Sequence, residues 1–493
     1  MNKDIYFSIL IQGAVGERKG VTVCIPADTN TLPGDWIKGL TAAARRVPLE
    51  NGERLHTEMQ VAPTSGIDRR PLDDYLWGDD TLNSERLIHH LMDYKERRVP
   101  HDFQPHVGMT VVMEEEFIGR RQVLALLEAH VGNKKSCHLR APRRYGKSSL
   151  MGRLAAKQEN ALMLELSDVG TLQGFLKALL RACMRHKLAS ACLLKQEAYR
   201  AWPLVADPAG FSQVFNQAFS DLTNAYSDKK LLDSLNETLT VLADHGIILL
   251  VDEFSIFLRD MHDNDRAALT DFLERLHRLR TRREKPLVAV FAGSAGLSTF
   301  IELYGMHNLF DDLAPVDVPP VTSDEACLLA EELFYGMKKL PTLAAIRRLV
   351  ELTGNDDTVP YFVQALASYT AEQTGRKRAI GADDVEQAYF DRLLGPAGNV
   401  CFRDFILRER AYPGEYRSSA SPILKRLSRS APDVVAEEEL QGLCTEGCDF
   451  KKIMTCLEED YDLVHAGNGW RMRSRVIAER WRLGEPWLTM GGK

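Results

Sequence analysis

The middle of the chain alternates between helical spacing of apolar residues and short, continuous apolar runs. The runs that we expect to form strands are Ser136–Leu139, Leu162–Leu166, Gly246–Val251 and Leu287–Ala292. The last two are apolar throughout, which is typical of strands buried on both faces of a parallel sheet. Helical spacing follows at Ser148–Lys157, Leu172–Arg185, Leu231–Asp244 and Arg266–Arg283. This alternation predicts an α/β domain over residues 111–320.

The flanking regions have different patterns. Residues 1–110 begin with two β-rich runs, Ile5–Ile11 and Gly20–Ile25, joined by a turn-like segment, and Asn83–Arg97 has helical spacing. They predict a small α+β domain of unknown role. Residues 321–398 have helical spacing throughout, which predicts a helical lid. Residues 399–493 indicate short helices followed by a hairpin at Leu463–Met472.

Composition excludes several classes of protein. With 45% hydrophobic and 27% charged residues the chain is ordinary globular material rather than disordered. Its 62 basic and 69 acidic residues give a net charge of -7, so electrostatic binding of nucleic acid or an anionic membrane by the chain as a whole is excluded. Nine irregularly spaced cysteines favour free thiols in a reducing compartment. Because no secretory leader and no long apolar segment is visible, we expect a cytoplasmic protein that does not span a membrane.

A phosphate-binding loop is the strongest chemical signal. Its residues are Ala141, Pro142, Arg143, Arg144, Tyr145, Gly146, Lys147 and Ser148, followed by Ser149 at the start of a helix. This matches G-x-x-x-x-G-K-[ST] except for alanine at the first glycine. Lys147 is expected to neutralise the β- and γ-phosphates, Ser148 to bind Mg²⁺, and Ser149 to reach the α-phosphate. The alternative interpretation is a basic surface loop before a helix.

Two further strand ends carry polar groups. Asp252 and Glu253 follow the apolar run that begins at Gly246, as in a Walker B strand. Asp252 is expected to hold Mg²⁺ through water, and Glu253 to act as general base towards the attacking water. Taken alone the pair also fits a solvated turn or a helix cap. Ser294 ends the next strand, where it either orients the water or caps a helix.

These motifs together resemble the AAA+/STAND-type ATPases of the archaeal or Orc-like kind. The resemblance covers about residues 112–493 and includes Phe117-Ile-Gly-Arg120 ahead of an amphipathic helix. It implies bound ATP and Mg²⁺, nucleotide contacts from Phe117 and Arg120, a lid whose Gly-x-Pro turn touches the nucleotide, and a C-terminal winged helix. Here the turn reads Thr353–Tyr361 and is three residues longer, which departs from the family pattern. The nucleotide contact from Pro360 is therefore an expectation to test.

A second departure concerns the arginine finger. Relatives often place an arginine after the sensor strand, whereas residues 305–312 contain none. The replacement candidates are Arg275, Arg278, Arg280, Arg282 and Arg283. We expect Arg282 or Arg283 to act in trans, which implies an ATP-dependent homo-oligomer. The alternative is a solvated helix end whose positive charge the helix dipole favours.

The C-terminal region gives little support for nucleic-acid binding. Residues 400–493 contain 15 basic and 15 acidic side chains. The expected recognition helix, Phe450–Glu459, offers only Lys451 and Lys452, and the basic side chains of the hairpin and its exit are Arg471, Arg473 and Arg475. Contact with a protein, or control of the lid, is the rival interpretation. Burial as small apolar residues explains Cys444, Cys448 and Cys456 better than a zinc site with His465 does.

The sequence therefore favours an Mg²⁺-dependent ATP hydrolase that acts as a nucleotide-driven switch or assembly platform. The N-terminal domain or the winged helix would bind a protein partner, and the resemblance makes antiviral defence or mobile-element biology an attractive setting. One alternative is an AAA+ loader or transposition regulator on double-stranded DNA. Another is a catalytically poor, nucleotide-dependent scaffold.

Overall fold

The computed structural model describes most of the chain from Phe117 onward. The described residues are 117–196, 215–220, 223, 226–293, 296–377, 379–402, 414–461 and 463–483, together with 104–105 and short N-terminal strands. Within this part of the chain, the helices include none that is long and apolar enough to cross a membrane.

A five-stranded parallel sheet forms the centre of the core, in the order β11-β7-β10-β9-β8. Its strands are β7 Cys137–Arg140, β8 Ala161–Glu165, β9 Ile248–Asp252, β10 Ala289–Phe291 and β11 Ala314–Asp317. The parallel α/β prediction is confirmed, and all four expected strands are present. Strand β11 was not expected, because this short edge strand has only two buried or half-buried apolar positions beside a proline and an aspartate.

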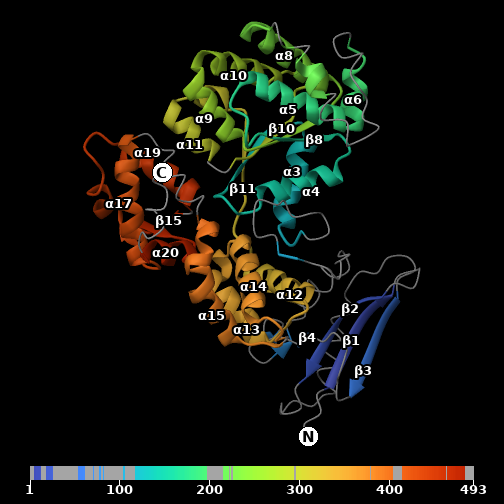
Figure 1. Ribbon diagram of the computed structural model, residues 1–493, viewed down its shortest axis with the longest axis vertical. Helices are drawn as coiled ribbons and strands as arrows, with labels where there is room; N and C mark the ends of the chain where they lie inside the picture. Colours follow the sequence, from blue (N-terminus) through green and yellow to red (C-terminus); the bar gives the residue numbers. More distant parts are fainter. Residues whose placement is uncertain are drawn as a thin grey trace.

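Helices cover both faces of this sheet (Figure 1). They are α3 Arg121–Gly132, α4 Lys147–Lys157, α5 Leu172–Arg185, α6 Lys187–Leu193, α8 Asp228–Asp244, α9 Phe254–Asn264, α10 Arg266–Arg280 and α11 Leu297–Tyr304. Successive residues of a strand point to opposite faces. In β9, Leu250 accordingly joins an apolar cluster with α3 and α4, while Leu249 and Val251 join a second cluster with α5, α8, α9 and α10.

A helical unit and a mixed unit follow the core. The first contains α12 Ser323–Gly336, α13 Leu343–Thr353, α14 Pro360–Thr374 and α15 Ala382–Ala388. The C-terminal unit contains α17 Gly414–Ser430, β14 Val435–Ala436, α18 Glu437–Gln441, α19 Phe450–Tyr461, β15 Leu463–Ala466, β16 Gly469–Met472 and α20 Arg475–Arg482. The expected hairpin is β15–β16, and β14 completes a three-stranded sheet. The winged-helix assignment and the four domain boundaries stay predictions.

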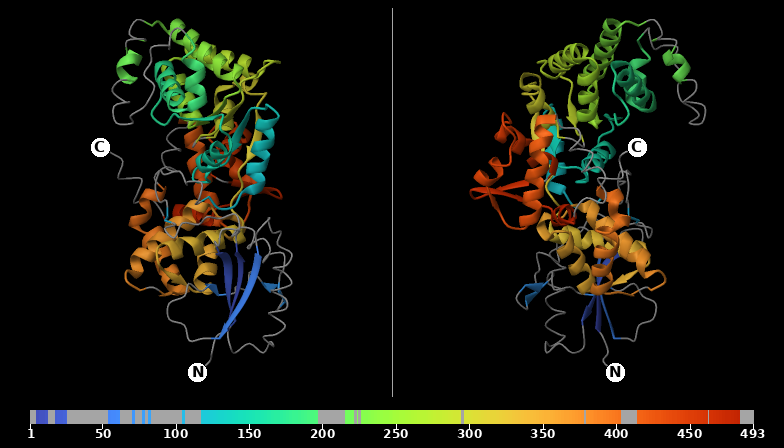
Figure 2. Two further views of the ribbon diagram at one scale, coloured as in Figure 1. Left: turned by 90° about the vertical axis from the view of Figure 1, so that its right-hand side faces the viewer. Right: turned by 60° about the vertical axis from the view of Figure 1, so that its left-hand side comes forward.

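The C-terminal unit packs against both the core and the helical unit, as Figures 1 and 2 show. Asp460, near the end of α19, is buried and accepts a 2.8 Å hydrogen bond from the backbone N–H of Gly296, which precedes α11. Tyr389 of the helical unit donates a 2.8 Å hydrogen bond to Glu479 of α20. The contact with Gly296 joins the C-terminal unit to the loop that follows β10.

The N-terminal strands form a separate sheet in the order β3-β1-β2-β4. Strands β1 Ile5–Gln12 and β2 Arg18–Ile25 are the expected antiparallel hairpin, and β3 Arg54–Val61 and β4 Arg70–Pro71 flank them. The helix expected at Asn83–Arg97 lies outside the described residues. Both figures place this sheet beside the helical unit, on the side remote from the core.

Candidate nucleotide-binding site

The loop between β7 and α4 has the backbone geometry that a phosphate-binding turn requires. Gly146, with φ of 84°, lies in the left-handed region at the N-cap of α4, and an added Cβ would meet no atom within 4 Å. Arg144 is also left-handed, with φ of 72°. Ala141 has no positive φ, so the alanine that replaces the first glycine of the motif is accommodated without strain. The loop therefore directs the positive end of α4 towards its own concave side.

Lys147 points back into this loop. Its Nζ donates hydrogen bonds to the carbonyl oxygens of Ala141, at 2.6 Å, and Pro142, at 2.9 Å. The side chain is buried, with only 7% of the residue exposed. A buried ammonium needs oxygen acceptors, and phosphate oxygens are stronger acceptors than the neutral carbonyls it now contacts. The loop thus fits a phosphate group.

Acidic side chains gather at the end of the adjoining strands. Asp252 is buried and lies in parallel register with Glu165 of β8. The Ser148 hydroxyl donates a hydrogen bond to Asp252, and the Glu253 N–H donates another at 2.9 Å. Burial raises the pKa of Asp252 to about 6, the two hydrogen bonds oppose the rise, and the nearby charges of Glu253 and Glu165 add to it.

This arrangement brings Ser148 and Asp252 together, as the sequence predicted for a magnesium site. Hydroxyl and carboxylate oxygens are ligands that Mg²⁺ accepts, and a divalent cation would offset the negative charge gathered there. The residues present therefore fit the ion. Glu165 was not expected at this site, although a carboxylate at the end of an expected strand was a signal for it.

Glu253 occupies a strained position. It has φ of 55° at the N-cap of α9, and the next N–H, of Phe254, donates a 2.8 Å hydrogen bond to the carbonyl of Ala292 at the end of β10. A left-handed non-glycine residue costs about 1–2 kcal/mol, and such strain persists where the surroundings impose it. The half-buried Glu253 is thereby held between two strand ends. Ser294, which was expected beside it, lies outside the described residues.

Arg120 provides buried donors behind the loop. Its backbone N–H donates a 2.8 Å hydrogen bond to Glu325 of α12, and its φ is 59°. Among the described residues, Nη1 and Nη2 of its guanidinium are buried and find no acceptor. Burial lowers the pKa of Arg120 to about 10, against the opposing effects of Glu325 and Tyr145. Unsatisfied donors next to the loop fit a ligand with acceptor atoms, in line with the expected role of Arg120.

The helical unit reaches the loop through an aromatic contact. The Arg144 guanidinium carbon lies 4.3 Å from the centroid of the Tyr361 ring, and Pro360 occupies the first turn of α14 directly before it. The three additional residues of this turn are accommodated in a short 3-10 helix, Asn355–Asp357. Pro360 is therefore brought close to the loop despite the longer turn, while its contact with a nucleotide stays a prediction.

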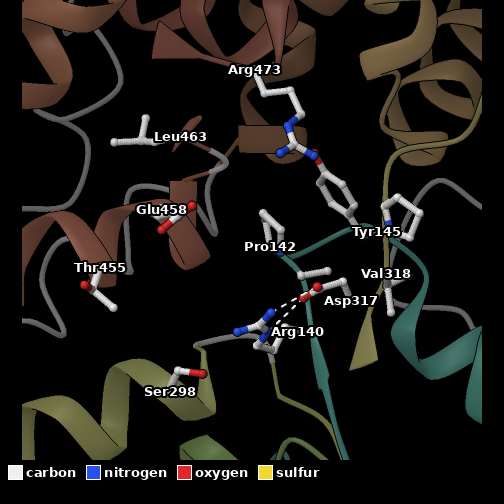
Figure 3. A pocket seen from close by; sticks show the side chains of 12 residues that line it. Arg140, Pro142, Tyr145, Ser298, Asp317, Val318, Thr455, Glu458, Leu463 and Arg473 are labelled. Atoms are coloured by element: carbon white, nitrogen blue, oxygen red, sulfur yellow. Dashed lines mark hydrogen bonds and ion pairs between the residues drawn. The ribbon is translucent and has the colours of Figure 1, made fainter. Parts of the chain in front are cut away.

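A cavity of about 440 Å³ lies between the loop and the C-terminal unit (Figure 3). On the core side, Arg140 pairs with Asp317 through two hydrogen bonds of 2.7 and 3.0 Å. Glu458 of α19 faces that pair, and Arg473 lies beside the Tyr145 ring. Sequence reasoning did not connect Arg140 with Glu458, because only the folding back of the C-terminal unit brings them together.

The arginine cluster of α10 is mostly occupied by ion pairs. Arg275 contacts Asp271 and Asp233, and Arg280 is buried against Asp312. Arg282 pairs with Asp244 at 3.2 Å. Arg283 is exposed and has no partner among the described residues.

Among the described residues, the only cluster of three or more His, Cys, Asp or Glu side chains with ligand spacing is His277, Asp311 and Asp312. Arg280 already neutralises Asp312 in this cluster. Cys444, Cys448 and Cys456 form no such cluster with His465 in the described part of the chain.

No protein-family model and no curated protein sequence matches the chain. Several solved structures have a similar fold. A Walker-type ATPase of Pyrococcus abyssi is 15% identical, with a TM-score of 0.49 over 78% of this chain and 99% of that one. The ORC2 protein of Aeropyrum pernix is 10% identical, with a TM-score of 0.39 over 79% and 98%. The RuvB Holliday junction branch migration motor of Thermotoga maritima is 14% identical, with a TM-score of 0.36 over 73% and 94%.

These likenesses are distant, and the fold assignment rests on the strand order, the loop and the acidic strand end of this chain. A parallel sheet, a Gly-Lys-Ser loop that opens a helix, and a buried strand ending in Asp252 and Glu253 occur here in one arrangement. The chain therefore has the P-loop NTPase fold, and its resemblance to AAA+ ATPases stays a resemblance of sequence motifs.

Proposed function

We propose that this protein binds ATP together with Mg²⁺, hydrolyses it, and uses the nucleotide state as a switch. The observation that carries the proposal is the juxtaposition of Lys147 in its loop with the Ser148–Asp252 pair at the end of β9. One side offers positive charge and N–H donors to phosphate oxygens, and the other offers oxygen ligands to a cation.

Each residue has a definable task in this chemistry. Lys147 and the loop N–H groups would bind the phosphates, and Ser148 and Asp252 would hold Mg²⁺, which neutralises phosphate charge when bound. Glu253, fixed at the start of α9, would accept the proton of the attacking water. Arg120 would donate its unsatisfied N–H groups to the nucleotide.

The switch is supported by what meets the site. Asp460 of the C-terminal unit contacts Gly296, two residues beyond the position of Ser294, and Arg144 of the loop contacts Tyr361 of the helical unit. Phosphate binding would change the hydrogen bonds of the loop, which the helical unit contacts through Arg144, while the C-terminal unit contacts the loop after β10 through Gly296. The nucleotide would thereby bias the positions of these units.

Self-association completes the proposal. Because Arg275, Arg280 and Arg282 are held by carboxylates, Arg283 is the candidate that supplies charge to a neighbouring subunit's γ-phosphate. A protein partner would bind through the N-terminal domain or the C-terminal unit. The defence or mobile-element setting rests on the sequence resemblance alone.

We expect Lys147→Ala to abolish measurable ATP binding, because the loop loses its buried ammonium. Isothermal titration with ATP and Mg²⁺ measures the affinity, and Lys157→Ala, at the exposed end of the same helix, is the matched control. Wild-type affinity in Lys147→Ala would contradict the site.

Glu253→Gln is expected to retain ATP while turnover falls by about 10²- to 10⁴-fold, because the amide keeps the shape but accepts no proton. Single-turnover hydrolysis with excess enzyme isolates the chemical step. If the variant and the wild type hydrolyse ATP at the same rate, Glu253 is not the base.

Mg²⁺-dependent ATP affinity is expected to fall below pH 6, because protonation of Asp252 competes with the cation. The pKa of Asp252 in the folded protein lies above the usual value of 3.8, so the ionised carboxylate destabilises the nucleotide-free fold above pH 6. This destabilisation disappears as the pH falls through about 6 and the carboxylate is protonated. Asp252→Asn should therefore raise the Tm of the nucleotide-free protein at pH 8 and remove the pH dependence of affinity. Glu165→Gln should move the midpoint of that dependence to lower pH. An unchanged Tm in Asp252→Asn, together with an unchanged midpoint of the pH dependence in Glu165→Gln, would place Asp252 outside the cation site.

ATP is expected to promote assembly, and Arg283→Ala to lower turnover in the assembled state with little change in ATP affinity. Mass photometry with a non-hydrolysable analogue, alongside turnover measured against protein concentration, tests both points. Lys187→Ala is the control, since Lys187 is exposed on α6 and is not one of the candidate arginines. A monomer with full turnover would argue against a contribution in trans.

A further inference from the structure

The C-terminal unit supplies the cap of a helix in the core. Helix α11 begins after Gly296, whose backbone has φ of -62° and ψ of 135° and which has no side chain to cap the helix. The backbone N–H of Gly296 donates its 2.8 Å hydrogen bond to Asp460 of α19, 164 residues away in the sequence. Both residues are buried. The start of α11 is therefore held by a side chain from another unit.

This contact replaces one that a helix often makes within itself. In a capping box, the side chain at the third helical position accepts a hydrogen bond from the N–H of the N-cap residue. Thr299 occupies that position in α11, and its buried hydroxyl finds no hydrogen-bond partner among the described residues. Asp460 takes over the role, and its negative charge lies at the positive end of the helix dipole. The cap is in place only while α19 lies against α11, as it does in Figure 1.

Helix α11 in turn packs against α9, which follows directly on β9. The ring of His262 on α9 contacts the rings of Phe300 and Tyr304 on α11, with centroids 6.4 and 4.0 Å apart. At the start of α9, the Phe254 ring stacks on Phe291 of β10 with centroids 4.5 Å apart. The two helices are thus held together on the sheet, and the position of α11 helps to fix that of α9.

Glu253 depends on this packing because its backbone is strained. Its φ of 55° is left-handed, and a residue keeps such a conformation only where its surroundings impose it. The Phe254 N–H is bound to the carbonyl of Ala292, which holds the first turn of α9, while α11 supports the rest of the helix. A tilt of α9 would carry the Glu253 carboxylate away from the attacking water, and a misplacement of about 1 Å can cost about 10²-fold in rate.

We propose that Asp460 is a positioning residue for ATP hydrolysis, which acts through α11 and α9 on Glu253. The inference rests on the proposed general-base role of Glu253, and it adds that the core hydrolyses ATP at full rate only when the C-terminal unit is docked. ATP binding is assigned to Lys147 and the Ser148–Asp252 pair, which belong to the core. Loss of the cap should therefore lower the rate of hydrolysis much more than the affinity for ATP.

Single-turnover hydrolysis and isothermal titration with ATP test the proposal on the full-length protein. Asp460→Ala should lower the rate at least about tenfold and change the affinity by less than about threefold. Asp460→Asn keeps an oxygen that accepts the Gly296 N–H, so its rate should stay within about threefold of the wild type. In a Glu253→Gln background, Asp460→Ala should cause no further fall, because the base through which it acts is already lost.

Tyr389→Phe is the matched control for Asp460→Ala. It also removes a 2.8 Å hydrogen bond made by the C-terminal unit, but one to the helical unit, and should leave the rate close to wild type. A second variant, Gly296→Pro, removes the donor instead of the acceptor, and its φ of -62° is one that proline adopts. It should reproduce the loss of Asp460→Ala, and the two changes together should lower the rate no further than either alone. Circular dichroism melting checks that each variant is folded, and either one tests the contact if the other unfolds.

Hydrogen exchange of the nucleotide-free protein tests the structural step without hydrolysis. Peptides that cover the starts of α9 and α11 should exchange faster in Asp460→Ala, whereas those of α4 should not change. The inference is overturned by unchanged exchange, by a wild-type or increased rate in Asp460→Ala, by an equal loss in Asp460→Asn, or by a full further loss in the Glu253→Gln background. A wild-type protein that does not hydrolyse ATP overturns the proposed function as well, whereas normal hydrolysis with an unchanged rate in Asp460→Ala overturns this inference alone.

Discussion

The parallel register of β9 with β8 and β10 is the constraint on which the rest of the site depends. Parallel strands end at a common edge, so Asp252, Glu165 and the end of β10 are brought together by backbone pairing alone. Desolvation of Asp252 is offset in part by hydrogen bonds from Ser148 and from the Glu253 N–H. The edge thus gathers negative charge on one side of a loop whose lysine donates hydrogen bonds to the carbonyl oxygens of Ala141 and Pro142. Such an imbalance is complementary to a phosphate bound with a divalent cation.

The units beyond the core contact each other, and the C-terminal unit also contacts the core near this edge. The helical unit and the C-terminal unit share buried contacts, among them the hydrogen bonds from Arg480 to Leu394 and Asn399 and from Tyr389 to Glu479. The C-terminal unit reaches the loop after β10 through the bond between Asp460 and Gly296. Partly exposed ion pairs are worth about 0–1 kcal/mol each, so contacts such as Arg471 with Asp357 can be exchanged more readily than a packed core.

Much of the core was predictable because its signals are local. Leu172–Arg185 was expected as a helix and forms one with the same bounds, since its apolar stripe and the Thr171 cap both lie within the segment. The four expected strands could be predicted because continuous apolar runs need burial on both faces. By contrast, β11 has little apolar character of its own and pairs with β7 across more than 170 residues of intervening chain.

The sequence by itself determined the chemistry that the loop and the strand ends offer, because Lys147, Ser148, Asp252 and Glu253 stand at fixed spacings from predictable elements. Only the tertiary structure decided which groups face one another across long separations. It placed Glu165 beside Asp252, Tyr361 under Arg144, and Asp460 on Gly296, and it committed Arg471 and Arg473 to Asp357. Residue type and spacing specify what a side chain can bond, whereas the packing of whole units selects the partner from many with the same chemistry.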